Sequence, residues 1–186
     1  AASDVYKRQT QAYSNPINKI NFIGLNNTSE STLLALIPFE IGQNFSPYLS
    51  DEIIKTLYET ELFENISIIK NDSSLDISLK ENPNIKYFEI KLINDSVFLS
   101  WLKGEKIHFS SEALNEQIVE NKLSTGNIFT KRKLEDFLSL LESKYSDSGY
   151  FNSVIIQEIE IDAQNRVGIE LIINQGNRAT IDSFGI

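Results

Sequence analysis

The sequence GQNFSPYLSDEIIKTLYETELFENISII, residues 42–69, predicts a capped amphipathic helix followed by a strand. Ser46 is placed to accept a hydrogen bond from the first turn of the helix, and Pro47 at the first helical position loses nothing by lacking an N–H. Apolar residues then recur at the spacing of one buried helix face: Leu49, Ile53, Ile54 and Leu57. From Phe63 onward apolar and polar residues alternate, which is typical of a strand buried on one side.

The same succession occurs again in GNIFTKRKLEDFLSLLESKY, residues 126–145, and in the aromatic-led strand that follows it. Each capped helix comes after a shorter helical stretch, at 30–37 in the first copy and at 112–123 in the second. Each copy also opens on a similar strand, INKINFIGL at 17–25 and IKYFEIKLI at 85–93. The order strand, helix, helix, strand, strand therefore appears twice, which indicates a repeat architecture.

These repeats predict how the chain is divided. We expect residues 1–15 to form a leader or disordered segment, residues 16–82 a first domain, and residues 83–176 a second domain. Residues 177–186 contain IDSFGI, which resembles the opening strand once more, so we expect the first strand of a truncated third domain there. A sheet covered on one face by two helices makes each domain a member of the α+β class.

The composition of the 186-residue chain excludes several classes of function. Because 26 acidic residues stand against 17 basic ones, for a net charge of −9, the field of the protein repels phosphate backbones and nucleic acid is not an expected partner. The absence of cysteine excludes disulfides, thiolate metal sites and thiol nucleophiles. No glycine-rich phosphate loop is present, and no run approaches the roughly 20 apolar residues of a membrane-spanning helix.

Enzyme chemistry would have to depend on carboxylates, the abundant catalytic residue type in this chain. Nothing in the sequence places two of them on facing elements of a cleft, as glycoside hydrolysis would require. His108 stands alone and cannot form a multi-histidine metal site. We therefore expect no catalytic residue, no metal and no cofactor.

The two units resemble POTRA domains, the polypeptide-transport-associated modules of the outer-membrane assembly family. The resemblance is carried by INKINFIGL, by the run IPFEIGQNF to NPNI at 37–85, and by GNIFTKRKL to EID at 126–162 with NRVGIELIINQG after it. It covers most of residues 16–186 and implies, in each unit, a three-stranded mixed sheet covered on one face by two helices. The segment 94–111 is longer than the family pattern between first strand and first helix.

The resemblance implies a binding module at the periplasmic face of the outer membrane. The implied partners are unfolded outer-membrane proteins, periplasmic chaperones and assembly lipoproteins, and the implied link to the membrane is a C-terminal barrel that this chain lacks. Two alternatives remain open. One is the POTRA region of a related transporter, of the translocation-assembly or two-partner-secretion type, and the other is a structural spacer.

A three-stranded sheet leaves two edges whose backbone groups can accept a guest strand. In POTRA domains the strand after the helices is expected at an edge, which corresponds here to 63–69 and to the longer strand 151–161. The candidate protein-binding residues are Phe63, Asn65, Ser67, Ile69, Phe151, Ser153, Ile155, Gln157 and Ile159. The alternative is a solvated edge on which Glu64, Glu158 and Glu160 discourage aggregation.

A second candidate surface is the segment 94–111, which contains the aromatic residues Phe98, Trp101 and Phe109. Aromatic residues clustered on an irregular loop often anchor a partner. The alternative is that these side chains complete the core of the second domain. His108 lies in the same segment, where we expect it on the surface or in packing.

Overall fold

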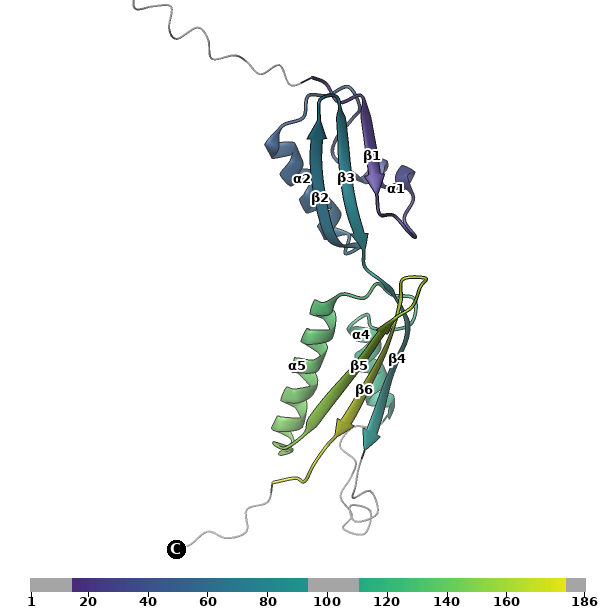
Figure 1. Cartoon of the computed structure of the whole chain (residues 1–186). Coiled ribbons are helices and arrows are strands. Elements are labelled where there is room, and N and C mark those ends of the chain that lie inside the picture. The colour runs from purple at the N-terminus through teal and green to yellow at the C-terminus, as the bar shows by residue number, and fades with distance from the viewer. Residues whose placement is uncertain (1–14, 94–110, 180–186) are drawn as a thin grey trace, which may run out of the picture. The chain divides into compact units, whose positions relative to one another are not determined.

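A computed structural model of the chain describes residues 15–93 and 111–179 (Figure 1). The chain divides into two compact units, Ala1–Glu81 and Asn82–Ile186. The first unit contains β1 (Lys19–Ile23), α1 (Glu30–Leu36), α2 (Pro47–Glu59), β2 (Phe63–Asn71) and β3 (Ser74–Glu81). The second contains β4 (Asn84–Ile93), α4 (Ser111–Glu120), α5 (Lys131–Asp147), β5 (Val154–Ile161) and β6 (Arg166–Asn174).

Each unit is built on a three-stranded mixed sheet. In the first sheet the strand order is β1-β3-β2, with β1 parallel and β2 antiparallel to β3. The second sheet repeats this arrangement as β4-β6-β5. In each unit both helices lie on one side of the sheet (Figure 1). The predicted α+β fold, with the order β-α-α-β-β in each unit, is confirmed.

The helices begin where the capping residues predict. The Ser46 hydroxyl accepts a hydrogen bond from the N–H of Leu49 (3.3 Å), and the Thr130 hydroxyl accepts one from the N–H of Lys133 (3.3 Å). Both capping residues have extended backbone conformations, as residues at this position usually do. Helix α2 and helix α5 therefore start at equivalent places in the two units.

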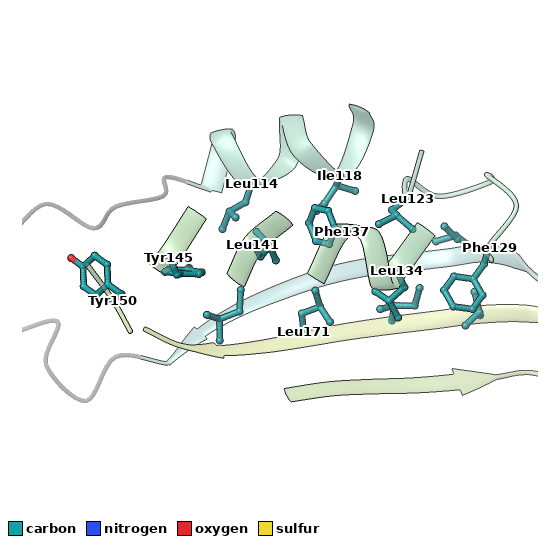
Figure 2. Packing of buried hydrophobic residues seen from close by; sticks show 14 residues of the cluster. Leu114, Ile118, Leu123, Phe129, Leu134, Phe137, Leu141, Tyr145, Tyr150 and Leu171 are labelled. Atoms are coloured by element: carbon teal, nitrogen blue, oxygen red, sulfur yellow. The ribbon is translucent and has the colours of Figure 1, made fainter. Parts of the chain in front are cut away.

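One cluster of buried apolar residues forms the core of each unit. In the first unit the predicted α2 residues Ile53 and Leu57 are fully buried, with Leu49 and Ile54 packed at the margin. In the second unit the apolar side chains of α4 and α5 lie between these helices and the strands β4 and β6 (Figure 2). Tyr145 belongs to this cluster, and burial raises its pKa to about 12.

The structure differs from the sequence prediction at the start of β5. We expected the strand to begin near Phe151, but it begins at Val154, and both Phe151 and Ser153 lie in the connection before it. Tyr150 explains the difference, because its N–H donates to the carbonyl of Tyr145 (2.9 Å) and its buried ring meets the Tyr145 ring edge to face. Because Tyr150 is held against the end of α5, pairing with β6 begins only several residues later, at Val154.

A second difference concerns Phe63, which was predicted among the residues that a partner would contact. Its side chain is only 2% exposed and belongs to the core of the first unit. The register of β2 against β3 shifts between Phe63 and Asn65, and this bulge turns the ring toward the helices. The aromatic residues Phe98, Trp101 and Phe109 and the segment 180–186 lie outside the described residues.

Candidate functional site

Strand β5 is an edge strand of the second sheet, since in the described residues it pairs only with β6. The pairing runs without a register shift from Val154 opposite Asn174 to Ile161 opposite Val167. An uninterrupted edge strand presents a row of backbone donors and acceptors that another extended chain can pair with. This makes β5 the more regular of the two candidate edges.

The turn at the end of the hairpin shows which backbone groups of β5 face outward. The N–H of Asp162 donates to the carbonyl of Arg166 (2.9 Å), so these two residues form a hydrogen-bonded pair of the antiparallel ladder. Hydrogen-bonded and non-hydrogen-bonded pairs alternate along such a ladder. The backbone groups directed to the free edge are therefore those of Ile155, Gln157, Ile159 and Ile161.

The side chains of these four residues lie on the helix-covered face, because each is opposite a buried residue of β6. They are nevertheless accessible in part, since Ile159 is 45% exposed and Ile161 is 60% exposed. In the first unit α2 packs along β2, and the helix-facing Ile66 is only 8% exposed. Helix α5 makes no comparably close approach to β5 in the described part of the chain, so aliphatic side chains flank this free edge.

Strand β2 is one of the two edge strands of the first sheet, and it is less regular than β5. Its bulge lies between Phe63 and Asn65, and the Glu64 carboxylate pairs with the Lys80 ammonium (2.6 Å) beside it. Bulges and charged residues are the usual means by which an edge strand is protected from unwanted pairing. The candidates Asn65, Ser67 and Ile69 lie on β2 opposite residues that face away from the core.

Three of the candidates predicted on β5 have backbone N–H and C=O groups that face the free edge: Ile155, Gln157 and Ile159. Ile161 belongs to the same row and was not among them. The signal for it was already present in the sequence, because the alternation of QEIEI at 157–161 continues to that residue. Phe151 and Ser153 precede the strand and so take no part in this row.

Metal clusters and membrane-spanning helices are two other kinds of feature for which the described residues can be checked. Within 15–93 and 111–179 no group of three or more histidine, cysteine or carboxylate side chains is arranged to hold a metal ion. None of the helices in these ranges has the length and apolar character needed to cross a membrane.

Comparison with known families gives a match to part of the second unit. Residues 102–176, which include most of the second unit, match the POTRA model, described as a surface antigen variable number repeat. Over these residues the second unit is similar to POTRA repeats. The first unit has the same element order and the same sheet topology as the second.

Among curated proteins, the chain is similar to the outer membrane protein assembly factor BamA of two bacteria. It is 26% identical over 165 residues to BamA of Neisseria meningitidis serogroup B, an alignment that covers 89% of this chain and 19% of the relative. It is 27% identical over 170 residues to BamA of Buchnera aphidicola subsp. Acyrthosiphon pisum, with coverages of 91% and 25%. The chain thus spans a quarter or less of the length of these relatives.

Among solved structures, the chain is similar to two domains of Omp85. One is the N-terminal domain of Omp85 from Thermosynechococcus elongatus, with a TM-score of 0.49 and 14% identity over 84% of this chain and 61% of that one. The other is POTRA1-2 of the periplasmic domain of Omp85 from Anabaena, with a TM-score of 0.46 and 13% identity over 84% of this chain and 94% of that one.

Proposed function

We propose that this POTRA chain is a periplasmic binding module of the machinery that assembles β-barrel proteins in the outer membrane. In this proposal it receives unfolded outer-membrane proteins, which add a strand to a free sheet edge, and it docks chaperones and assembly lipoproteins. Its activity is binding and not turnover. The observation that carries the proposal is β5, an edge strand paired over its whole length without a bulge.

The physical chemistry of strand addition suits a module that handles many clients. Backbone hydrogen bonds do not depend on the client sequence, so extended chains of different sequence can pair with the same edge. The exposed aliphatic side chains Ile159 and Ile161 favour clients with alternating apolar residues, because such residues would lie beside them on the same face. Transmembrane strands of outer-membrane proteins have this alternation.

The proposal is tested by titrating the ¹⁵N-labelled chain with a synthetic peptide that corresponds to one transmembrane strand of an outer-membrane protein. We expect the largest chemical-shift changes at the edge-directed amides of Ile155, Gln157, Ile159 and Ile161. The variant Gln157→Pro removes one of these N–H groups without removing a bond to β6, and we expect it to weaken binding about tenfold. The matched variant Gln157→Ala keeps the N–H and should bind as the parent does.

Two outcomes would contradict the proposal. Absence of any shift at millimolar peptide would leave the structural spacer as the function of the two units. Equal weakening by Gln157→Pro and Gln157→Ala would show that the side chain, and not backbone pairing, binds the peptide. A related transporter of the translocation-assembly or two-partner-secretion type would use the same edge, and the full-length reading frame would distinguish it.

A further inference from the structure

The second sheet has an open face, opposite the side that the helices cover. Residues of this face alternate with the buried residues of each strand. We use the name open face for these residues: Tyr87, Glu89, Lys91 and Ile93 of β4, Val154, Ile156, Glu158 and Glu160 of β5, and Gly168, Glu170 and Ile172 of β6. It differs from the β5 edge because a partner would contact its side chains and not the free backbone groups.

Three glutamates cross the middle of the open face in one line. Glu170 on the central strand is directly opposite Glu89 on one side and Glu158 on the other. Like charges directly opposite each other in a sheet are destabilising. Lys91 compensates only part of this charge, through an ion pair between its ammonium and the Glu170 carboxylate (2.7 Å).

The negative charge of these glutamates raises the pKa of neighbouring groups. The Glu170 carboxylate, aided by Glu89 and Glu158, holds the pKa of Lys91 above its usual value. The Tyr87 hydroxyl donates to the Glu160 carboxylate (2.7 Å), and this contact raises the pKa of Tyr87. At the hairpin end, Lys86 and Arg166 are both paired with Asp162 and so do not neutralise the glutamates.

An apolar patch adjoins the three glutamates at the opposite end of the face from Tyr87. Ile172 on the central strand is directly opposite Ile156, and Ile93 and Val154 lie one row further along. Ile93, Val154 and Ile156 are each about half exposed. Aliphatic side chains gathered beside charged ones are characteristic of a protein-binding surface, with an apolar centre and a polar rim.

The open face of the first sheet has no line of glutamates, although Ile23 and Ile69 are exposed on it. Its central residue Asp76 accepts hydrogen bonds from the amides of Asn21 (2.6 Å) and Asn71 (2.7 Å), and serines occupy the neighbouring positions of β3. These polar groups satisfy one another within the sheet. A line of three glutamates beside aliphatic side chains is therefore particular to the second unit and is not a consequence of the repeated fold.

We propose that the open face of the second sheet docks a basic, partly apolar protein segment, whose lysine or arginine side chains lie over Glu89, Glu158 and Glu170 and whose aliphatic side chains cover Ile156 and Ile172. The negative charge of the three glutamates favours a basic partner over an acidic one. A second copy of the chain would bring two lines of glutamates together, and nucleic acid or anionic lipid would meet the same repulsion. The proposal does not depend on strand addition at β5, since the two surfaces use different groups.

The probe is the synthetic peptide acetyl-LLSKKSKK-amide, titrated into the ¹⁵N-labelled full chain at low salt, with acetyl-LLSEESEE-amide as its matched control. We expect the lysine peptide to shift the amides of Ile156, Glu158, Glu170 and Ile172. We expect the variant Glu158→Gln with Glu170→Gln to bind it about fivefold more weakly. The same variant should be close to the parent in stability, because it removes the two repulsive pairs of Glu170 and also its exposed ion pair with Lys91.

A matched variant tests whether the location of the charge matters. Glu135→Gln with Glu142→Gln removes two exposed carboxylates from α5 and should leave peptide affinity unchanged. If both double variants bound the lysine peptide equally more weakly than the parent, the proposal would be overturned, because the peptide would then be attracted by the overall negative charge of the chain. Four further results would overturn the proposal. They are binding of the glutamate peptide, shifts restricted to the β5 edge amides, the absence of any shift, and shifts of the same face that depend on protein concentration without peptide.

Discussion

At the scale of single residues, Glu81 is the charged side chain on which the first unit depends most. It ends β3, is only 5% exposed, and its two carboxylate oxygens accept the N–H groups of Asn27 and Thr28 at 2.8 Å each. Burial of the Glu81 carboxyl opposes its ionisation, but these backbone donors hold the pKa of Glu81 below its usual value. Gly24 lets the same loop approach β3, since at φ +91° a Cβ would lie 2.2 Å from the Leu79 carbonyl oxygen.

Glu81→Gln should lower the free energy of unfolding of the first unit at neutral pH by about 1–3 kcal/mol, because an amide cannot accept both N–H groups as a carboxylate does. The pKa of Glu81 is lower in the folded state than in the unfolded one. Its contribution is therefore present above the unfolded value, about 4.3, and is lost as the pH falls through the folded value. Urea denaturation at neutral pH and near pH 3 should show the difference between variant and parent shrinking in acid.

The control for this experiment is Glu59→Gln, which changes an exposed carboxylate of α2 with a long contact (3.9 Å) to Lys55. Exposed pairs of this kind contribute little, so the control should follow the parent at both pH values. A difference between Glu81→Gln and the parent that stays the same in acid would contradict the role assigned to the carboxylate.

At the scale of elements, the start of α5 combines a favourable cap with an unfavourable charge. Thr130 caps the helix, yet Lys131, Arg132 and Lys133 place positive charge in the first turn, where the helix dipole favours negative charge. We expect Thr130→Ala to destabilise the second unit by about 1 kcal/mol, and Thr130→Asp to be at least as stable as the parent because it keeps an acceptor and adds a negative charge. Denaturant midpoints of the second unit measure this order, and a Thr130→Ala variant as stable as the parent would contradict it.

At the scale of the whole molecule, the two units have separate cores, so each should unfold according to its own packing. Phe137 is fully buried in the second core, and Phe137→Ala should cost that unit about 3–5 kcal/mol. Residue-resolved NMR in increasing urea should then show the second unit unfolding early while the first keeps its midpoint. Leu57→Ala is the reciprocal variant, and joint unfolding of both units in either variant would contradict the prediction.

Much of the fold was predictable because its signals are local. The caps at Ser46 and Thr130, the helix faces after them and the alternation of the strands each depend on residues a few positions apart, and their repetition predicted the element order. The candidate edge was predictable only in part. Phe63 carries the pattern of a half-exposed strand, but a bulge that depends on pairing with β3 directs its ring to the core, and contact with Tyr145 delays the start of β5 past Phe151.

Sequence alone therefore determined which elements form and in what order, because short-range hydrogen bonding and apolar periodicity decide both. Tertiary structure alone decided which backbone groups of β5 face the free edge and that Glu89, Glu158 and Glu170 lie in one line. These facts depend on register, since a shift of one residue in strand pairing would move every side chain to the other face. Register is a property of segments that are far apart in the chain and meet only when the sheet has formed.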